Sequence, residues 1–278
     1  MEKQSKIKWR IKSNDGLELF VHAFPSEDEP KGIVCVVHGH GEHIERYEHL
    51  AKRLNEAKYS MIGFDLRGHG QSEGRRGHTP SYDAMMEDID LFLAEVDEHY
   101  AGLPKFLYGH SMGGNLVLNY AIRRNPDVKG VLATGPWLKL SFEPPATQVL
   151  LAKMMQKLFP AFTQNSGLAT DALSRDPEVV RAYEEDPYVH DKLSASLFTE
   201  IHSAGLWALE HAAEFPLPLL LMHGGADRIT SAEASKEFGE KAEEKTDLKI
   251  WEGFYHEIHN EPEKEDVFKT VIDWMDAQ

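Results

Sequence analysis

The sequence predicts an α/β protein in which a mostly parallel sheet is covered by helices on both faces. Short apolar or β-branched runs, typical of strands buried on both faces, occupy residues 33–38, 60–65, 105–109, 130–134, 218–223 and 247–252. Longer amphipathic segments alternate with them, at residues 82–99, 112–124, 231–243 and 263–276. Such alternation is typical of parallel βαβ units.

Two local patterns refine this prediction. Residues 6–12 and 17–24 alternate in polarity around the turn Asn14-Asp15-Gly16, which predicts a β-hairpin ahead of the parallel strands. Thr230 precedes Glu233 by three residues, the spacing of a capping box, and predicts the start of the 231–243 helix.

Residues 137–205 interrupt the alternation, because they hold helical fragments and no strand-like run. The clearest fragment is 146–159, where leucine, methionine and phenylalanine side chains form a broad apolar stripe opposite Lys153 and Lys157. We interpret 137–205 as a helical cap inserted into a single domain. The core of that domain is then 1–136 and 206–278.

Composition excludes several classes of partner. The chain has 46 acidic and 30 basic side chains, a net charge of −16, and this repels nucleic acid. Its single cysteine, Cys35, lies in an apolar strand run and is expected in the core. The N-terminus MEKQSKIKWR has no apolar stretch behind its charges, and no run approaches the ~20 apolar residues of a membrane span. We therefore expect a cytoplasmic protein, at most peripheral to a membrane; the oligomeric state stays open.

The motif with the sharpest chemical meaning is Gly109-His110-Ser111-Met112-Gly113-Gly114. It follows one predicted strand and opens the 112–124 helix, the context of a G-x-S-x-G nucleophile elbow. The glycines permit a tight turn that raises the hydroxyl of Ser111 above the sheet. Helix N–H groups next to it can then stabilise an oxyanion.

A serine needs a base that an acid holds in place, and both partners follow later in the chain. Asp227 lies in the loop after strand 218–223, and His256 lies in the loop after strand 247–252. Both loops leave the carboxyl ends of strands, where active sites of open parallel sheets lie. His259, three residues on, is the alternative base.

A second glycine-rich segment, His38-Gly39-His40-Gly41-Glu42-His43, follows strand 33–38. It is expected to supply a second oxyanion-hole amide, so that the N–H groups of His40 and Met112 form the hole. The same segment also permits a different interpretation. The imidazoles of His38, His40 and His43 are similar in spacing to the zinc motif of metallo-β-lactamase-type hydrolases.

The segment Asp65-Leu66-Arg67-Gly68-His69-Gly70-Gln71-Ser72 ends another strand. Asp and Ser favour turns and caps, and glycine favours backbone at positive φ. We assign this segment to holding the loops beside the site.

Together these motifs resemble those of the monoacylglycerol lipase and lysophospholipase group of α/β-hydrolases. The matching stretches are HGHGEHIERY (38–47), FDLRGHGQSEG (64–74), GHSMGG (109–114), YEEDP (183–187), LLLMHGGADRIT (219–230) and WEGFYHEIHNE (251–261). The resemblance implies an α/β-hydrolase fold with Ser111 as nucleophile, Asp227 as acid and His256 as base. It also implies that Glu42, Arg46 and His259 lie near the polar end of the substrate.

The function expected on these grounds is hydrolysis of a lipid-like monoester, a monoacylglycerol or a lysophospholipid, through an acyl-enzyme. No metal and no organic cofactor is expected, and the partner is a small-molecule ester with a fatty acyl chain. The stripe of 146–159 then lines an acyl tunnel or contacts a lipid surface, unless it only packs on its own domain. Alternatives with the same triad are a broad carboxylesterase, a thioesterase, an acyltransferase or an aminopeptidase. A non-catalytic binding module and the zinc hydrolase are further alternatives.

Overall fold

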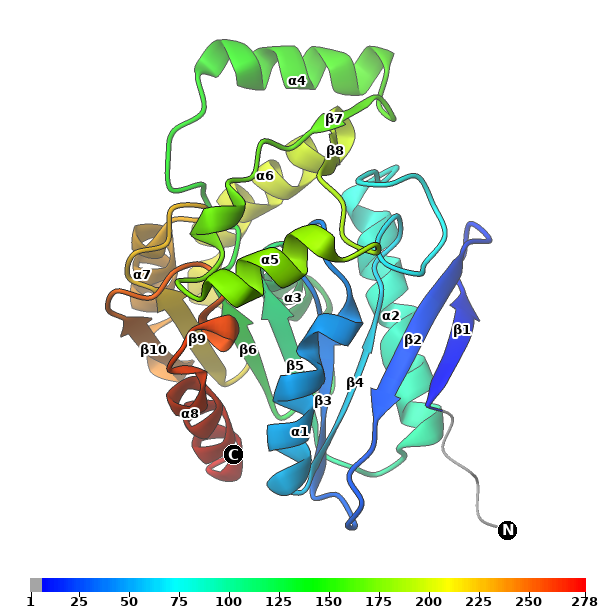
Figure 1. The fold of residues 1–278 in the computed structure, drawn as a ribbon, viewed down its shortest axis with the longest axis vertical. Helices are drawn as coiled ribbons and strands as arrows, with labels where there is room; N and C mark the ends of the chain where they lie inside the picture. The colour runs from blue at the N-terminus through cyan, green and yellow to red at the C-terminus, as the bar shows by residue number, and fades with distance from the viewer. Residues whose placement is uncertain (1–6) are drawn as a thin grey trace.

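The computed structural model describes residues 7–278 (the backbone alone at residue 146), and its centre is an eight-stranded sheet (Figure 1). Its strands are β1 (Lys8–Lys12), β2 (Glu18–Phe24), β3 (Gly32–Val37), β4 (Tyr59–Phe64), β5 (Lys105–His110), β6 (Gly130–Thr134), β9 (Leu219–Gly224) and β10 (Thr246–Trp251). They follow the order β1-β2-β4-β3-β5-β6-β9-β10 across the sheet.

Pairing within the sheet confirms the mostly parallel arrangement. β1 pairs antiparallel with β2, and β2 pairs antiparallel with β4, whereas every other pair is parallel. The predicted hairpin is therefore present, with its turn between Lys12 and Glu18. Residue 6 of the predicted hairpin lies outside the described residues, as do the first six residues of the segment MEKQSKIKWR.

Helices cover both faces of the sheet (Figure 1). α1 (Glu48–Glu56) and α8 (Lys264–Asp276) pack on one face, and α2 (Tyr82–His99), α3 (Met112–Arg124), α6 (Ala195–Glu210) and α7 (Ala232–Lys241) belong to the layer on the other. β3 shows why a central strand reads as a continuous apolar run. Ile33, Cys35 and Val37 face the second layer, while Val34 and Val36 face the first. Cys35 is buried, as predicted.

The predicted cap of α7 is wrong by one residue. The helix begins at Ala232, and Ser231 is its N-cap, because the Ser231 side chain accepts a hydrogen bond from the N–H of Ala234. The hydroxyl of Thr230 lies instead 3.0 Å from the carbonyl oxygen of Gly135 and 2.8 Å from Asp227. Thr230 therefore serves the loop that carries Asp227 rather than the helix.

The segment between β6 and β9 lies above the sheet (Figure 1). It contains α4 (Ala146–Leu158) and α5 (Pro177–Glu185), as well as α6, which packs on one face of the sheet. Contrary to the prediction that it has no strand, it also contains β7 (Thr163–Asn165) and β8 (Lys192–Ser194), which pair antiparallel. These strands have three residues each and are largely polar, so no apolar run marks them. The predicted boundary of the cap at residue 205 falls inside α6. The division of the chain into cap and core stays a prediction.

Short 3₁₀ helices complete the chain: η1 (Ile44–Tyr47), η2 (Thr170–Ala172), η3 (Ala212–Glu214), η4 (Glu243–Lys245) and η5 (Ile258–Asn260). Backbone hydrogen bonds join the upper segment to the loops at the carboxyl ends of the strands. The N–H of His190 donates to the carbonyl of Gly41 at 2.9 Å, and that of Glu257 donates to Leu173 at 2.8 Å. None of the helices within residues 7–278 has the length and apolarity that crossing a bilayer requires.

Candidate active site

Ser111 occupies a strained turn between β5 and α3. Its φ of 55° and ψ of −115° belong to a region that residues with a side chain rarely adopt. The neighbouring glycines make this turn possible, because a Cβ at Gly109 would lie 2.4 Å from the carbonyl oxygen of Gly113. A Cβ at Gly113 would lie 2.0 Å from the carbonyl oxygen of Val37. The strand–turn–helix context predicted for this motif is therefore confirmed.

Three side chains from distant loops form one hydrogen-bonded line. Nε2 of His256 lies 2.9 Å from Oγ of Ser111, and Nδ1 of His256 lies 2.7 Å from Oδ2 of Asp227. All three side chains are buried, with Ser111 only 7% exposed. The arrangement can transfer the hydroxyl proton to the imidazole while the carboxylate fixes the tautomer of the ring.

The electrostatics of the line favour a charged imidazole beside an ionised acid. Burial alone would raise the pKa of Asp227, but the charge of His256 and hydrogen bonds from His223 and His256 hold it well below its ordinary value. Burial alone would lower the pKa of His256, but Asp227 outweighs burial and raises it. Asp227 also accepts hydrogen bonds from the N–H groups of Ile229 and Thr230, at 2.7 and 3.1 Å.

Two backbone amides beside Ser111 are available for an oxyanion. The N–H of Met112 opens α3, where the first N–H groups have no partner within the helix. Over residues 7–278, neither this N–H nor that of His40 meets a hydrogen-bond acceptor. Gly39, just before His40, lies close to Ser111, since a Cβ on it would be 3.2 Å from Cβ of the serine.

His259, the alternative base, lies away from the serine. Its ring stacks on Tyr47, with centroids 5.0 Å apart, and meets His110 edge-on at 4.7 Å. Burial lowers the pKa of His259 to about 3. His256 is thus the imidazole that the fold places against Ser111.

The histidines of the zinc interpretation point to different partners. Nδ1 of His38 lies 2.7 Å from the carbonyl of Gly39, and its Nε2 accepts the N–H of Leu66, so both ring nitrogens are engaged. His43 bonds to Asp186, whereas His40 packs against His69 and His190. Within the described part of the chain, no three His, Cys, Asp or Glu side chains converge as metal ligands. The zinc interpretation is therefore wrong.

Glu42 and Arg46 form a buried ionic cluster with Glu257, a residue to which no sequence motif assigned a role. Nη1 of Arg46 donates to Glu42 at 2.6 Å, and the guanidinium donates twice to Glu257, at 2.7 and 2.8 Å. Glu42 also accepts the N–H of Gly39 at 2.7 Å and the hydroxyl of Tyr47 at 2.8 Å. The cluster ties the loop after β3 to the loop after β10.

The segment from Asp65 to Ser72 holds neighbouring loops, as predicted. The carboxylate of Asp65 accepts the N–H groups of Ile44 and Gln71, at 2.8 and 2.7 Å. The hydroxyl of Ser72 donates to the carbonyl of Asp65 and accepts the N–H of Phe20. A Cβ at Gly70 would lie 2.1 Å from Oδ2 of Asp65, so glycine is required there.

A cavity of about 710 Å³ lies between Ser111 and the segment above the sheet. His256, Glu42 and Gly39 line its floor, while side chains of α4 and α6, among them Met155 and Phe198, line its walls. Arg46 and His259 do not line the cavity. Its volume and mostly apolar lining suit a small molecule with a long apolar part.

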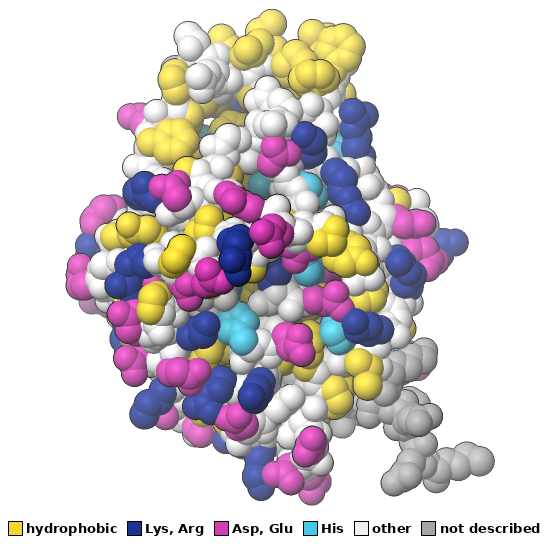
Figure 2. Space-filling view, in the orientation of Figure 1, with side chains coloured by type: hydrophobic (Ala, Val, Ile, Leu, Met, Phe, Trp, Pro, Cys, Tyr) yellow, Lys and Arg dark blue, Asp and Glu magenta, His cyan; other side chains and the backbone are white. Residues whose placement is uncertain are grey.

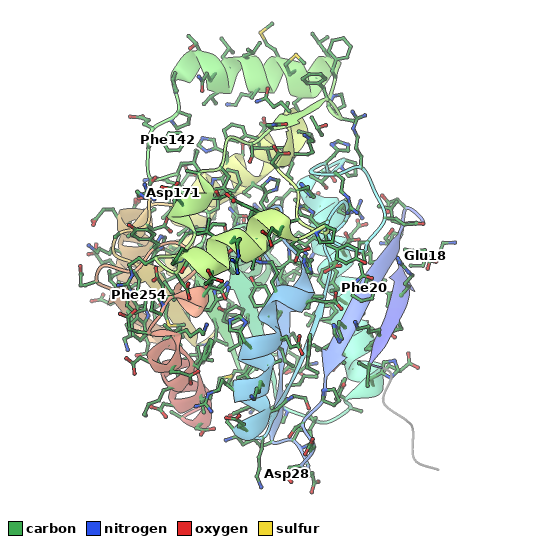
Figure 3. All side chains as sticks on the ribbon, in the orientation of Figure 1. Glu18, Phe20, Asp28, Phe142, Asp171 and Phe254 are labelled. Atoms are coloured by element: carbon green, nitrogen blue, oxygen red, sulfur yellow. The ribbon has the colours of Figure 1, made fainter. Side chains whose placement is uncertain are left out.

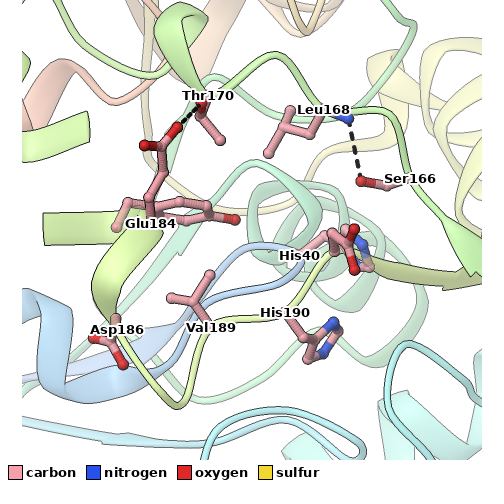
Figure 4. Close-up of a pocket in the computed structure, with 10 residues that line it drawn as sticks. His40, Ser166, Leu168, Thr170, Glu184, Asp186, Val189 and His190 are labelled. Atoms are coloured by element: carbon pink, nitrogen blue, oxygen red, sulfur yellow. Dashed lines mark hydrogen bonds between the residues drawn. The ribbon is translucent and has the colours of Figure 1, made fainter. Parts of the chain in front are cut away.

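A smaller cavity of about 300 Å³ adjoins the first, because the two share four lining residues: His40, Ser166, Leu168 and Tyr183 (Figure 4). Its wall is more polar. The hydroxyl of Thr170 donates to Glu184, and the hydroxyl of Ser166 accepts the N–H of Leu168.

The strained serine precedes a helix, and the imidazole and carboxylate that line up with it lie on later loops, at the carboxyl ends of parallel strands. This arrangement defines the class of α/β-hydrolases. Residues 28–263 match the family Hydrolase_4, serine aminopeptidase S33, and the chain belongs to this family. It is a carboxylic-ester hydrolase of monoglyceride-lipase-like type.

Three known proteins illustrate the similarity. A monoacylglycerol lipase of Mycolicibacterium smegmatis is 34% identical over 94% of this chain and 93% of its own length. The crystal structure of a monoacylglycerol lipase of Paleococcus ferrophilus has a TM-score of 0.85 and 37% identity, and the match covers 92% of this chain and 98% of that one. An uncharacterized abhydrolase domain-containing protein of Dictyostelium discoideum is 32% identical over 95% of this chain, which spans 28% of its length.

Proposed function

We propose that this hydrolase cleaves fatty-acid monoesters, namely monoacylglycerols or lysophospholipids, through an acyl-enzyme on Ser111. The observation that carries the proposal is the hydrogen-bonded line Ser111–His256–Asp227 on the floor of a large, mostly apolar cavity. The relatives named monoacylglycerol lipase favour the same substrate class.

Acylation is the first half of the proposed reaction. His256 takes the proton of Ser111 as Oγ attacks the ester carbonyl, and Asp227 stabilises the imidazolium that forms. The N–H groups of His40 and Met112 stabilise the tetrahedral oxyanion, and the loss of one such donor typically costs about 10²–10³ in rate. When the intermediate collapses, His256 gives its proton to the departing alcohol.

Deacylation repeats the same steps with water. His256 removes a proton from a water molecule that attacks the acyl carbonyl, and the Ser111 oxygen leaves with the proton that His256 returns. The products are a fatty acid and the free enzyme.

The polar end of the substrate is proposed to meet the ionic cluster. Glu42 is the member of the predicted set that lines the cavity, where its carboxylate can accept a hydrogen bond from a headgroup hydroxyl. We assign Arg46 to holding Glu42 in place, since the guanidinium lies 2.6 Å from that carboxylate. His259 stacks on Tyr47, whose hydroxyl donates to Glu42 at 2.8 Å, and so supports the same carboxylate.

The acyl end is proposed to enter past α4, which would also contact a lipid surface. Leu151 and Met155 line the cavity, so one side of the helix faces the substrate. An apolar patch covers the outer side (Figure 2), and Phe142 extends it along the chain that leads into α4 (Figure 3). Every residue of the patch is more than half exposed: Leu150, Met154, Leu158 and Phe159 do not line the cavity, whereas Phe142, Leu151 and Phe162 also line it. Contiguous exposed apolar surface of this kind marks an interaction site.

A substrate panel tests the proposal. Hydrolysis rates are compared for monoacylglycerols, lysophospholipids and acyl thioesters of increasing chain length, and for short p-nitrophenyl esters. We expect monoesters of long chains to be cleaved fastest, whereas rates that ignore chain length would favour a broad carboxylesterase. Ser111→Ala should abolish turnover, while Ser26→Ala, at the opposite end of the sheet, should retain it. Turnover retained in Ser111→Ala would refute the nucleophile assignment.

A further inference from the structure

A second imidazole contacts the carboxylate of Asp227. Nε2 of His223 lies 3.0 Å from Oδ2 of Asp227, the same oxygen that faces Nδ1 of His256 at 2.7 Å. His223 precedes the last residue of β9 and is fully buried. The substrate cavity does not reach it, so His223 has no direct part in binding or in the chemistry.

The far nitrogen of this imidazole has a partner of its own. Nδ1 of His223 lies 2.7 Å from the hydroxyl of Ser235, a buried residue of α7. A carboxylate only accepts hydrogen bonds, so Nε2 of His223 carries the hydrogen that faces Asp227. In the neutral ring Nδ1 is then the acceptor, and the hydroxyl of Ser235 donates to it. Ser235 thereby selects the tautomer that can donate to Asp227.

Few other groups face this part of the carboxylate. Oδ1 of Asp227 accepts the N–H groups of Ile229 and Thr230. The Thr230 hydroxyl lies near Oδ2, but it also lies 3.0 Å from the carbonyl of Gly135 and has one hydrogen for the two acceptors. The titratable side chains that act on Asp227 are His256 and His223. Those that act on His256 are Asp227, Glu257 and Glu42, and the ring of His110 packs against that of His256 with centroids 4.8 Å apart.

We propose that His223 is a positioning residue that holds Oδ2 of Asp227 in line with His256, and that Ser235 sets the tautomer of His223 for this task. The inference rests on the proposed function of Ser111, His256 and Asp227. It extends the line to five side chains, from Ser235 through His223, Asp227 and His256 to Ser111.

The hydrogen bond from His223 has a second consequence. A donor on a carboxylate favours its charged form and disperses the charge. Without that donor, Asp227 attracts the proton on His256 more strongly, so the pKa of His256 rises further. Because the base must be unprotonated in the free enzyme, the acid limb of the kcat/KM profile moves to higher pH. A residue that merely fills space would not move this limb.

Four variants test the inference through the pH dependence of p-nitrophenyl butyrate hydrolysis: His223→Phe, His223→Gln, Ser235→Ala and Lys236→Ala. His223→Phe removes the donor and retains a ring, whereas His223→Gln retains an N–H at nearly the place of Nε2. Ser235→Ala removes one hydroxyl and frees the other tautomer. Lys236→Ala, on the exposed side of the same helix, is the matched control.

We expect His223→Phe to lower kcat about tenfold, with KM nearly unchanged, and to move the acid limb upward by about one pH unit. His223→Gln should restore much of the rate and return the limb towards the wild-type position. Ser235→Ala should shift the limb in the same direction by a smaller amount, and it guards against a His223→Phe variant that does not fold. Lys236→Ala should match the wild type.

An unmoved limb in both His223→Phe and Ser235→Ala would overturn the inference, as would His223→Gln behaving like His223→Phe. If His223→Phe does not fold, an unmoved limb in Ser235→Ala alone overturns it. A different result, turnover retained in Ser111→Ala, would refute the proposed function. The two failures are therefore distinguishable.

Discussion

The buried ionic cluster makes a sharp prediction for Arg46→Met. Arg46 neutralises two carboxylates at once, and the side chains of Glu42, Arg46 and Glu257 are at most 10% exposed. Methionine fills a similar volume but leaves both acids without a cation. Removing one partner of a buried ion pair typically costs about 3–5 kcal/mol. For a chain of this length we expect Tm to fall by roughly 6–10 °C.

The loss should depend on pH in a defined direction. Burial alone would raise the pKa of Glu257, but Arg46 outweighs burial and holds it well below the ordinary value. A group with a lowered pKa contributes stability above its unfolded pKa and loses it as the pH falls. In Arg46→Met the guanidinium no longer opposes burial, so the pKa values of both acids rise, and their protonation in acid relieves the variant. The difference in free energy of unfolding between wild type and variant should therefore shrink as the pH falls from about 8 to about 5.

Urea unfolding at several pH values measures this, with Arg181→Met as the matched control. Arg181 also pairs with a glutamate, but its side chain is 63% exposed, so its loss should cost less than about 1 kcal/mol. Replacing the whole cluster, as Glu42→Gln, Arg46→Met and Glu257→Gln together, should recover part of the lost stability, because no buried charge is left unpaired. An Arg46→Met variant as stable as Arg181→Met, or one with no pH dependence, would refute this reasoning.

Three further outcomes are expected. Asp227→Asn should lower kcat by about 10⁴ with little change in KM, as measured by steady-state kinetics, since it spoils the tautomer but not the geometry; a loss below tenfold would count against its role. Burial alone would lower the pKa of His256, but Asp227 outweighs burial and raises it. The acid limb of kcat/KM should therefore lie above the ordinary value of 6.5, and a limb below that value would contradict this. Leu150→Ser with Met154→Ser should weaken sedimentation with phosphatidylcholine vesicles yet leave hydrolysis of p-nitrophenyl acetate unchanged, and equal sedimentation would argue that the patch meets no lipid.

Much of the fold could be predicted because its signals are local. A central strand such as β3 is buried on both faces, so its sequence is an unbroken apolar run. The elbow around Ser111 was recognisable because glycine is required at positions where a Cβ would collide with backbone. The order of the loops along the chain then brought Asp227 and His256 to the same edge of the sheet.

The features that sequence reasoning missed depend on distant partners. Arg46 and Glu257 are 211 positions apart, and nothing near either residue indicates that they pair. His223 reads as an ordinary strand residue, because its contacts with Asp227 and Ser235 arise only when the loop and α7 fold back. Thr230 and Glu233 have the spacing of a capping box, but the hydroxyl of Thr230 donates to the carbonyl oxygen of Gly135, a residue distant in the sequence.

Labelling with a fluorophosphonate probe tests the central claim most directly, since only an activated serine reacts readily with it. Mass spectrometry of the digested adduct should find one probe per chain on the peptide that contains Ser111, and His256→Ala should abolish the labelling. A probe on another serine, or an active enzyme that leaves Ser111 unmodified, would contradict the account.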